Sequence, residues 1–87
     1  MSSPQLPPAW QNEAFDQALD TAGLACPLPL LKTKLALSQM LSGQVLRVVA
    51  TDAGSWRDIQ AFAERAGHTL CRAERDETLF CYWLQKA

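Results

Sequence analysis

"QVLRVVATDAGSWRDIQAFAERAG", residues 44–67, contains a strand followed by a helix. Residues 44–52 are apolar and rich in β-branched side chains, with Arg47 as the only interior charge, which predicts a buried strand. Residues 56–66 carry apolar side chains at the i, i+3, i+4 and i+7 positions, which predicts an amphipathic helix. These side chains are Ile59, Phe62, Ala63 and Ala66.

The boundaries of this helix are also predicted from its flanking residues. Ser55 is a favourable N-cap, and Asp58 three residues later completes a pair that resembles a capping box. Gly67 follows the last apolar position and is expected to end the helix.

The residues before this unit predict a similar strand and helix. In the strand from Phe15 to Thr21, apolar positions alternate with aspartates. A helix is expected from Pro27 to about Leu41, because proline is well tolerated at the first helical position. Ser42-Gly43 should end it, with the glycine free to adopt a left-handed conformation.

The C-terminal residues predict a β-hairpin with strands 69–74 and 79–85 and a turn at Arg75–Thr78. A two-residue loop at Asp76-Glu77 would pair Cys71 with Tyr82 and Ala73 with Phe80. A three-residue loop would instead place Arg72 and Glu74 on the apolar face, and burying two charges is costly. The first pairing is therefore favoured, with Cys71 inside and Cys81 on the opposite face.

The predicted order is β-α-β-α-β-β, which gives an α/β (α+β) two-layer sandwich. In it, two helices cover one face of a four-stranded mixed sheet. Residues 1–13 contain three prolines and little to bury, so they are expected to be a flexible N-terminal leader, with Trp10 able to adhere to the body. Residues 14–87 form the single domain.

The composition and the cysteine spacing argue against several classes of protein, including nucleic-acid-binding, membrane-spanning and metal-binding ones. The 87 residues are 48% hydrophobic and 20% charged with a net charge of −1, which is typical of a globular protein without a strongly basic nucleic-acid surface. No apolar run is long enough to cross a membrane, and no secretory signal is recognised, so a cytoplasmic location is expected. The three cysteines are widely spaced and His68 is the only histidine, so neither a disulfide framework nor a metal site is expected, and no cofactor is implied.

Cys26 is the candidate reactive residue. It stands where the first helix begins, in the stretch "GLACPLPLLK", residues 23–32. As the N-cap, it would lie near the positive end of the helix dipole, which predicts a lowered thiol pKa. Gly23 gives conformational freedom to the chain that leads to Cys26, and Pro27 and Pro29 stiffen the first turn of the helix.

Several reactions are excluded around this thiol. Position 29 is proline, so no resolving cysteine follows as in thioredoxin-like exchange. His68 is expected to be a structural residue at the end of the second helix, which leaves no base for a cysteine hydrolase. Ala53-Gly54-Ser55 has only one glycine and is no phosphate loop. A solitary exposed thiol favours a carrier that hands a group to a partner.

The first helix carries two apolar stripes. Leu30, Leu37 and Leu41 form one, and Leu28, Leu31 and Leu35 form another about 120° away. The second stripe either packs on the neighbouring helix or the leader, or it is a docking surface beside Cys26. Lys32 belongs to the same candidate partner-binding surface and is too far along the helix to affect the thiol.

The sequence resembles the TusA-like (SirA-type) sulfur-carrier family from about Leu19 to Lys86. The matching elements are Leu19-Asp20, Gly23-Leu24, Cys26-Pro27-x-Pro29, Gly43, Asp52, Asp58-Ile59 and Gly67-His68. The resemblance implies the fold predicted above and a sulfurtransferase in which Cys26 accepts sulfane sulfur as a persulfide. It also implies that Asp52 and Asp58 organise the loop and the start of the second helix.

The implied partners are a sulfur donor, either a cysteine desulfurase or a rhodanese-like protein, and a sulfur acceptor. The acceptor would serve tRNA thiolation, cofactor synthesis or sulfur oxidation. Ala25, Leu28 and Ala53 depart from residues common in relatives, which makes the surroundings of Cys26 more apolar. Two alternatives stay open: a non-catalytic regulatory or redox-sensing module using Cys26 and the leucine stripe, and an enzyme of selenium or thiosulfate metabolism.

Overall fold

The computed structural model describes residues 6–87 and has the predicted order of strands and helices. A short 3₁₀ helix precedes them. The elements are η1 (Pro8–Trp10), β1 (Gln17–Thr21), α1 (Leu28–Ser38), β2 (Val45–Ala50), α2 (Ser55–Ala66), β3 (Thr69–Arg75) and β4 (Phe80–Gln85).

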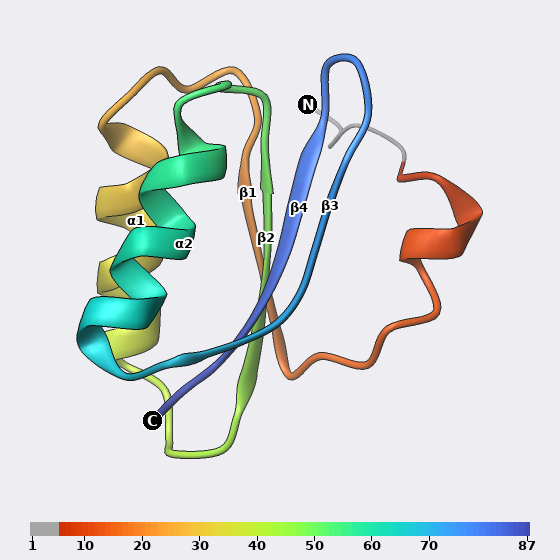
Figure 1. Cartoon of the computed structure of the whole chain (residues 1–87). Coiled ribbons are helices and arrows are strands. Elements are labelled where there is room, and N and C mark those ends of the chain that lie inside the picture. The colour runs from red at the N-terminus through yellow and green to blue at the C-terminus, as the bar shows by residue number, and fades with distance from the viewer. Residues whose placement is uncertain (1–5) are drawn as a thin grey trace.

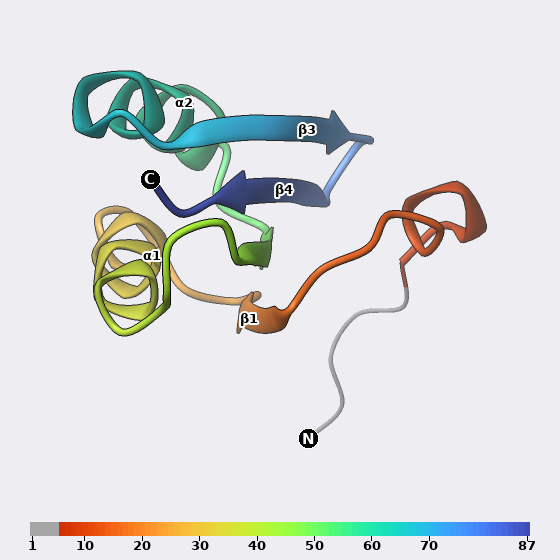
Figure 2. The ribbon, with the colours of Figure 1, turned by 90° about the horizontal axis from the view of Figure 1, so that it is seen from below.

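The four strands form one mixed sheet in the order β1-β2-β4-β3. β1 is parallel to β2, and β4 is antiparallel to both β2 and β3. α1 and α2 lie side by side on one face of this sheet (Figures 1 and 2). The predicted two-layer sandwich is therefore confirmed.

The main core lies between the helices and the sheet. The buried apolar side chains in this layer are Leu37, Met40, Leu46, Val48, Ala50, Ile59, Ala63, Phe80, Tyr82 and Leu84. The Tyr82 hydroxyl and the Ser55 hydroxyl are hydrogen-bonded at 2.7 Å within this core. That bond attaches the first residue of α2 to the central strand β4, and a buried hydroxyl requires such a partner.

The N-terminal segment covers the other face of the sheet. Leu6 and Trp10 are buried there and pack in one cluster with Val49, Leu79, Cys81 and Trp83. The predicted leader with little to bury thus contains two buried side chains, while its residues 1–5 lie outside the described part.

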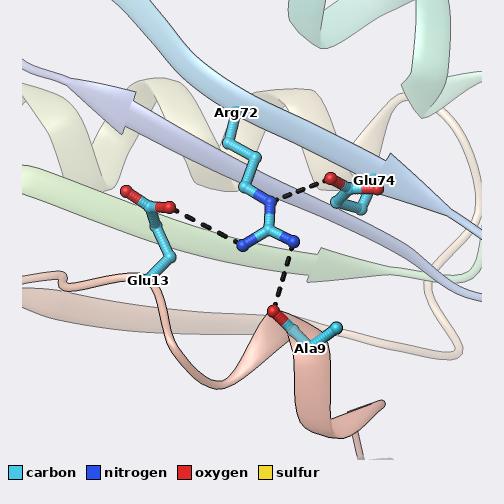
Figure 3. Close-up of polar contacts among 4 residues, drawn as sticks. All are labelled: Ala9, Glu13, Arg72 and Glu74. Atoms are coloured by element: carbon cyan, nitrogen blue, oxygen red, sulfur yellow. Dashed lines mark hydrogen bonds and ion pairs between the residues drawn. The ribbon is translucent and has the colours of Figure 1, made fainter.

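Arg72 of β3 connects this segment to the sheet, as Figure 3 shows. Its guanidinium donates to the Ala9 carbonyl oxygen at 3.2 Å and to Glu74 Oε2 at 2.8 Å, and it lies 3.6 Å from Glu13 Oε1. The same guanidinium carbon is 4.9 Å from the centroid of the Trp83 ring. Three polar contacts and one aromatic face therefore place a single side chain between the segment and the sheet.

Two predicted boundaries of the first α-helical unit are wrong. α1 ends at Ser38 rather than near Leu41, because the Gln39 amide bonds back to Ala36 and Leu37 in a tighter turn. The chain then turns Met40 into the core and leaves Leu41 72% exposed. Gly43 is not the helix cap; it has a φ of +89° and donates its N–H to the Lys86 carbonyl oxygen at 2.8 Å.

The predicted start of α2 is also wrong. Gly54 is the N-cap, and Ser55 is already the first helical residue. The Ser55 hydroxyl donates to the Asp52 carbonyl oxygen at 2.7 Å instead of capping the helix. The end of α2 is as predicted, with Gly67 in the left-handed conformation at φ +80°.

The hairpin differs from the predicted pairing by two residues. Arg75 faces Phe80 and Ala73 faces Tyr82, because Asp76 Oδ1 accepts from the Thr78 and Leu79 amides and closes a longer loop. A shift of two keeps every side chain on its predicted face. Cys81 is accordingly on the face opposite Tyr82, as predicted.

The prediction for Cys71 is wrong. The ladder between β3 and β4 is irregular between Leu70 and Arg72, and Cys71 lies at this bulge with its side chain exposed. A bulge adds an unpaired residue and redirects its side chain, which period-two alternation does not anticipate.

We expect Trp10→Ala to lower the free energy of unfolding by about 3–5 kcal/mol, because a buried aromatic side chain is lost from the cluster between the N-terminal segment and the sheet. Urea unfolding followed by circular dichroism measures this change. Asn12→Ala, at an exposed position of the same segment, is the control and should change stability by no more than about 0.5 kcal/mol. Equal unfolding midpoints for Trp10→Ala and the wild type would contradict a packed N-terminal segment.

Candidate functional site

The two connections from strand to helix meet at one edge of the sheet. Parallel strands end at the same edge, so the chain leaves β1 and β2 side by side. The Thr21 hydroxyl donates to the Val49 carbonyl oxygen at 2.7 Å, and the Gly23 N–H donates to Thr51 Oγ1 at 2.9 Å. Gly23 has a φ of +85°, a conformation that side chains other than glycine rarely adopt, so this residue type suits the bend.

Cys26 lies in the first of these connections, and its side chain is exposed. The predicted N-cap position is wrong by one residue. Pro27 is the N-cap of α1, and the peptide bond between Cys26 and Pro27 is cis. The thiol therefore stands just outside the helix, before its first turn.

The first turn of α1 offers few amides to an anion. Pro27 and Pro29 have no N–H, and the Leu28 N–H donates to the Ala25 carbonyl oxygen at 2.9 Å. The Leu31 N–H donates to the Pro27 carbonyl oxygen at 3.0 Å. The N–H group of Leu30 is therefore the one amide of this turn that has no backbone acceptor among the described residues. The helix terminus is thus poorly equipped to stabilise a thiolate.

Carboxylates surround the thiol instead. Cys26 Sγ donates to Asp58 Oδ2 at 3.6 Å across the gap between the two connections. Asp52 Oδ2 is buried and has no hydrogen-bond partner within residues 6–87. Gly54 allows this arrangement, because a Cβ at that position would lie 3.0 Å from Asp52 Oδ2 and 3.9 Å from Asp58 Oδ2.

These surroundings raise the pKa of the Cys26 thiol above its ordinary value. The causes are loss of solvent around the sulfur, the hydrogen bond to Asp58, and the negative charges of Asp58 and Asp52, while Arg57 acts in the opposite direction. The predicted lowering of the Cys26 pKa is therefore wrong. The prolines remove the amides that would favour a thiolate, and the carboxylates disfavour it.

The other two cysteines have different surroundings. Cys81 is completely buried under the N-terminal segment, and this burial raises its pKa to about 11. Cys71 is exposed on the edge strand β3, and within residues 6–87 the one polar contact of its side chain is a weak one of 3.9 Å to the Thr69 carbonyl oxygen. Within residues 6–87, Cys26 is the one cysteine whose sulfur is hydrogen-bonded to an ionisable side chain.

The second stripe of α1 faces solvent. Leu28, Leu31 and Leu35 are 43%, 50% and 62% exposed, whereas Pro29, Thr33 and Leu37 form the buried side of the helix. Of the two interpretations left open for this stripe, packing against α2 or against residues 6–13 of the N-terminal segment is therefore wrong. We call Leu28, Leu31 and Leu35 the leucine patch. Leu41, placed by its spacing in one stripe with Leu30 and Leu37, is exposed beyond the end of the helix.

The structure brings together only part of the predicted set. Gly23, Cys26, Asp52 and Asp58 meet at the sheet edge, while Lys32 is exposed farther along α1. Sequence reasoning missed Gly54 and Thr51 as residues that shape this site. The available signal is the glycine two residues after Asp52, which the sequence analysis considers only as a candidate for a phosphate loop.

Within residues 6–87, no three side chains of His, Cys, Asp or Glu gather as they do around a metal ion. No helix in that part of the chain is both long and apolar enough to cross a membrane.

Comparison with known proteins gives three consistent matches. A family model described as Sulfurtransferase TusA matches residues 17–86. The sulfur carrier protein TusA of Allochromatium vinosum is 47% identical over 73 residues, which cover 84% of this chain and 96% of the relative. The crystal structure of a SirA-like protein from Desulfitobacterium hafniense has a TM-score of 0.71 and 25% identity, covering 80% of this chain and 96% of that one.

We expect Asp58→Asn to increase the rate of Cys26 alkylation by iodoacetamide near neutral pH. Removing the negative charge lowers the pKa of the thiol, so more thiolate is present at a given pH. The measurement is the pH dependence of the rate by mass spectrometry, in a Cys71→Ser background that leaves Cys26 as the exposed thiol.

Glu64→Gln is the matched control, because it removes an exposed carboxylate from the same helix away from the thiol. It should leave the alkylation profile of the wild type unchanged. If Asp58→Asn and Glu64→Gln gave the same profile, the contact between Asp58 and Cys26 would have no effect on the thiol.

Proposed function

The chain belongs to the TusA sulfurtransferase family, and on that basis we propose that it is a sulfur carrier that holds sulfane sulfur as a persulfide on Cys26. The family match spans the chain from β1 to the residue after β4. The observation that carries the proposal is the exposed Cys26 thiol beside Asp58, at the edge where both connections meet.

The transfer follows the chemistry of thiol–disulfide exchange. The Cys26 thiolate attacks the outer sulfur of a donor persulfide, a new bond forms to Sγ, and the donor leaves as its own thiolate. A thiolate of the acceptor then attacks the outer sulfur and releases Cys26. Each step exchanges one S–S bond for another, so no net oxidation or reduction is needed.

Asp58 is suited to handle the proton in the first step. In the resting protein it accepts the S–H hydrogen bond from Cys26 and favours the neutral thiol over the thiolate. A protonated thiol is a weak nucleophile, so unwanted reactions of the free carrier are slow. A donor that brings positive charge to this edge would lower the thiol pKa and allow the proton to leave through Asp58 or solvent.

The leucine patch is suited to bind the donor or the acceptor protein. It begins two residues after Cys26 and continues along the exposed side of α1. Three leucines in successive turns form a contiguous apolar surface, which is typical of protein interaction sites. Leu28 lies between Pro27 and Pro29, so its position relative to the thiol is held by a stiff segment.

We expect incubation with a sulfane-sulfur donor to add one or more sulfur atoms to the protein by mass, with the addition reversed by a thiol reductant. Cys26→Ser should abolish the gain, while Cys71→Ser should retain it. Peptide mapping locates the label. A gain that persists in Cys26→Ser would refute the assignment, and no gain in any variant would favour the regulatory or redox-sensing alternative.

For the leucine patch, we expect Leu31→Glu to reduce the rate of sulfur transfer from a donor protein about tenfold or more, because a charge is placed in an apolar contact. The far-UV circular dichroism and unfolding midpoint should stay near those of the wild type, since Leu31 is half exposed. Leu41→Glu is the control, an exposed leucine outside the patch that should leave transfer unchanged. Equal rates for the two variants would contradict docking on the patch.

A further inference from the structure

A cavity opens between α1 and α2 toward the helix ends that lie away from Cys26. Its volume is about 530 Å³, and both apolar and positively charged side chains line it. Leu30, Leu37 and Phe62 provide apolar lining, and Lys34, Arg65 and Lys86 provide three cations. Figure 1 shows the C-terminal end of the chain beside these helix ends, which is how Lys86 reaches the cavity.

The three cations lack an ion-pair partner in the part of the chain that the structure describes. Within residues 6–87 the ion pairs are those of Arg72, so Lys34, Arg65 and Lys86 make none there. No aspartate or glutamate lines the cavity. Three of the eight basic residues in a chain of net charge −1 therefore face one cavity, and their mutual repulsion is relieved when an anion binds.

Two side chains that line the cavity, those of Lys86 and His68, are held in place by the protein. Lys86 Nζ donates to the Leu37 carbonyl oxygen at 2.9 Å, which fixes the ammonium group at the cavity. His68 Nδ1 accepts from the Ala87 N–H at 3.0 Å, so the neutral ring carries its proton on Nε2. Burial and the charge of Lys86 lower the pKa of His68, which is consistent with a positive potential in this region.

The apolar lining indicates what kind of anion fits. The Phe62 ring lies 5.4 Å from the His68 ring and 5.5 Å from Lys34 Nζ, so an aromatic surface borders the cations. A lone inorganic oxyanion would leave most of the volume and all of this surface unused. Sites for small organic ligands commonly occupy about 300–1,000 Å³ and combine an apolar lining with a few polar groups.

We propose that this cavity binds a small organic anion. Its carboxylate, sulfonate or phosphate group contacts Lys34, Arg65 and Lys86, and its apolar or aromatic body lies against Leu30 and Phe62. The site is separate from the thiol: Lys34 is about 9 Å along α1 from its first residue, and Arg65 about 15 Å along α2. Its occupancy can therefore be tested independently of sulfur transfer.

The test uses the full chain and the aromatic sulfonate 1-anilinonaphthalene-8-sulfonate, with affinity measured by fluorescence titration. Lys34→Gln and Arg65→Gln should each weaken binding about threefold to tenfold, because each removes a charge-assisted contact. Lys32→Gln is the matched control, an exposed lysine on the same helix that does not line the cavity, and it should bind like the wild type. Circular dichroism verifies that each variant is folded.

Two further measurements identify the site and the ligand class. Amide shifts in ¹H–¹⁵N spectra should move at Leu30, Phe62 and Lys86, and the uncharged analogue N-phenyl-1-naphthylamine should bind more weakly and be insensitive to Lys34→Gln. Shifts confined to the leucine patch, or affinity unchanged in both cavity variants, would overturn the proposal. So would a hexaglutamate peptide that binds at these amides more tightly than the sulfonate, since that would indicate an acidic protein segment as the ligand.

Discussion

The parallel pairing of β1 with β2 is the constraint on which the candidate site depends. Because Thr21 is paired with Ala50 where both strands end, the two connections leave the sheet as neighbours. Side-chain hydrogen bonds from Thr21 and Thr51 join them, and Cys26 from the first connection meets Asp58 from the second. The contact between thiol and carboxylate, 32 residues apart in sequence, is thus a consequence of topology.

The position of α2 relative to the sheet is fixed by a hydrogen bond from the central strand β4. β4 lies on the other side of β2 and carries Tyr82, whose hydroxyl bonds Ser55 in the core. Ser55 also bonds the Asp52 carbonyl oxygen, so the loop and the first turn of α2 are tied to the sheet at one residue. The orientation of Asp58 toward Cys26 therefore depends on a buried polar contact, and such contacts are costly to leave unsatisfied.

Sequence patterns are sufficient to predict the order of strands and helices. They are insufficient to predict the helix end, the bulge and the hairpin loop. The apolar periodicity of residues 56–66 and the β-branched run at 44–52 identified elements whose burial is set by simple repeats. The end of α1, the bulge at Cys71 and the loop at Asp76 depend on particular hydrogen bonds, which periodicity does not encode.

The same limit applies to the thiol. Pro27 is enough to predict that Cys26 stands just before a helix. It is not enough to predict that the pKa of the thiol is raised. That direction depends on Asp58, which is distant in sequence, and on amides that Pro27 and Pro29 lack. General rules for helix termini assume that the first-turn amides are available. A sequence that replaces two of them with proline removes the basis of the rule.

The charges at the two ends of α2 follow the dipole of that helix. Asp58 lies in the first turn of α2 and Arg65 in its last turn, which are the favourable ends for each sign. The two ends of the layer consequently differ: carboxylates gather beside Cys26, and cations gather around the cavity between the helices. A net charge of −1 conceals this separation, because composition sums over both ends. In the proposed carrier, a positively charged partner surface is attracted to the thiol end, while an organic anion is repelled from it and attracted to the cavity.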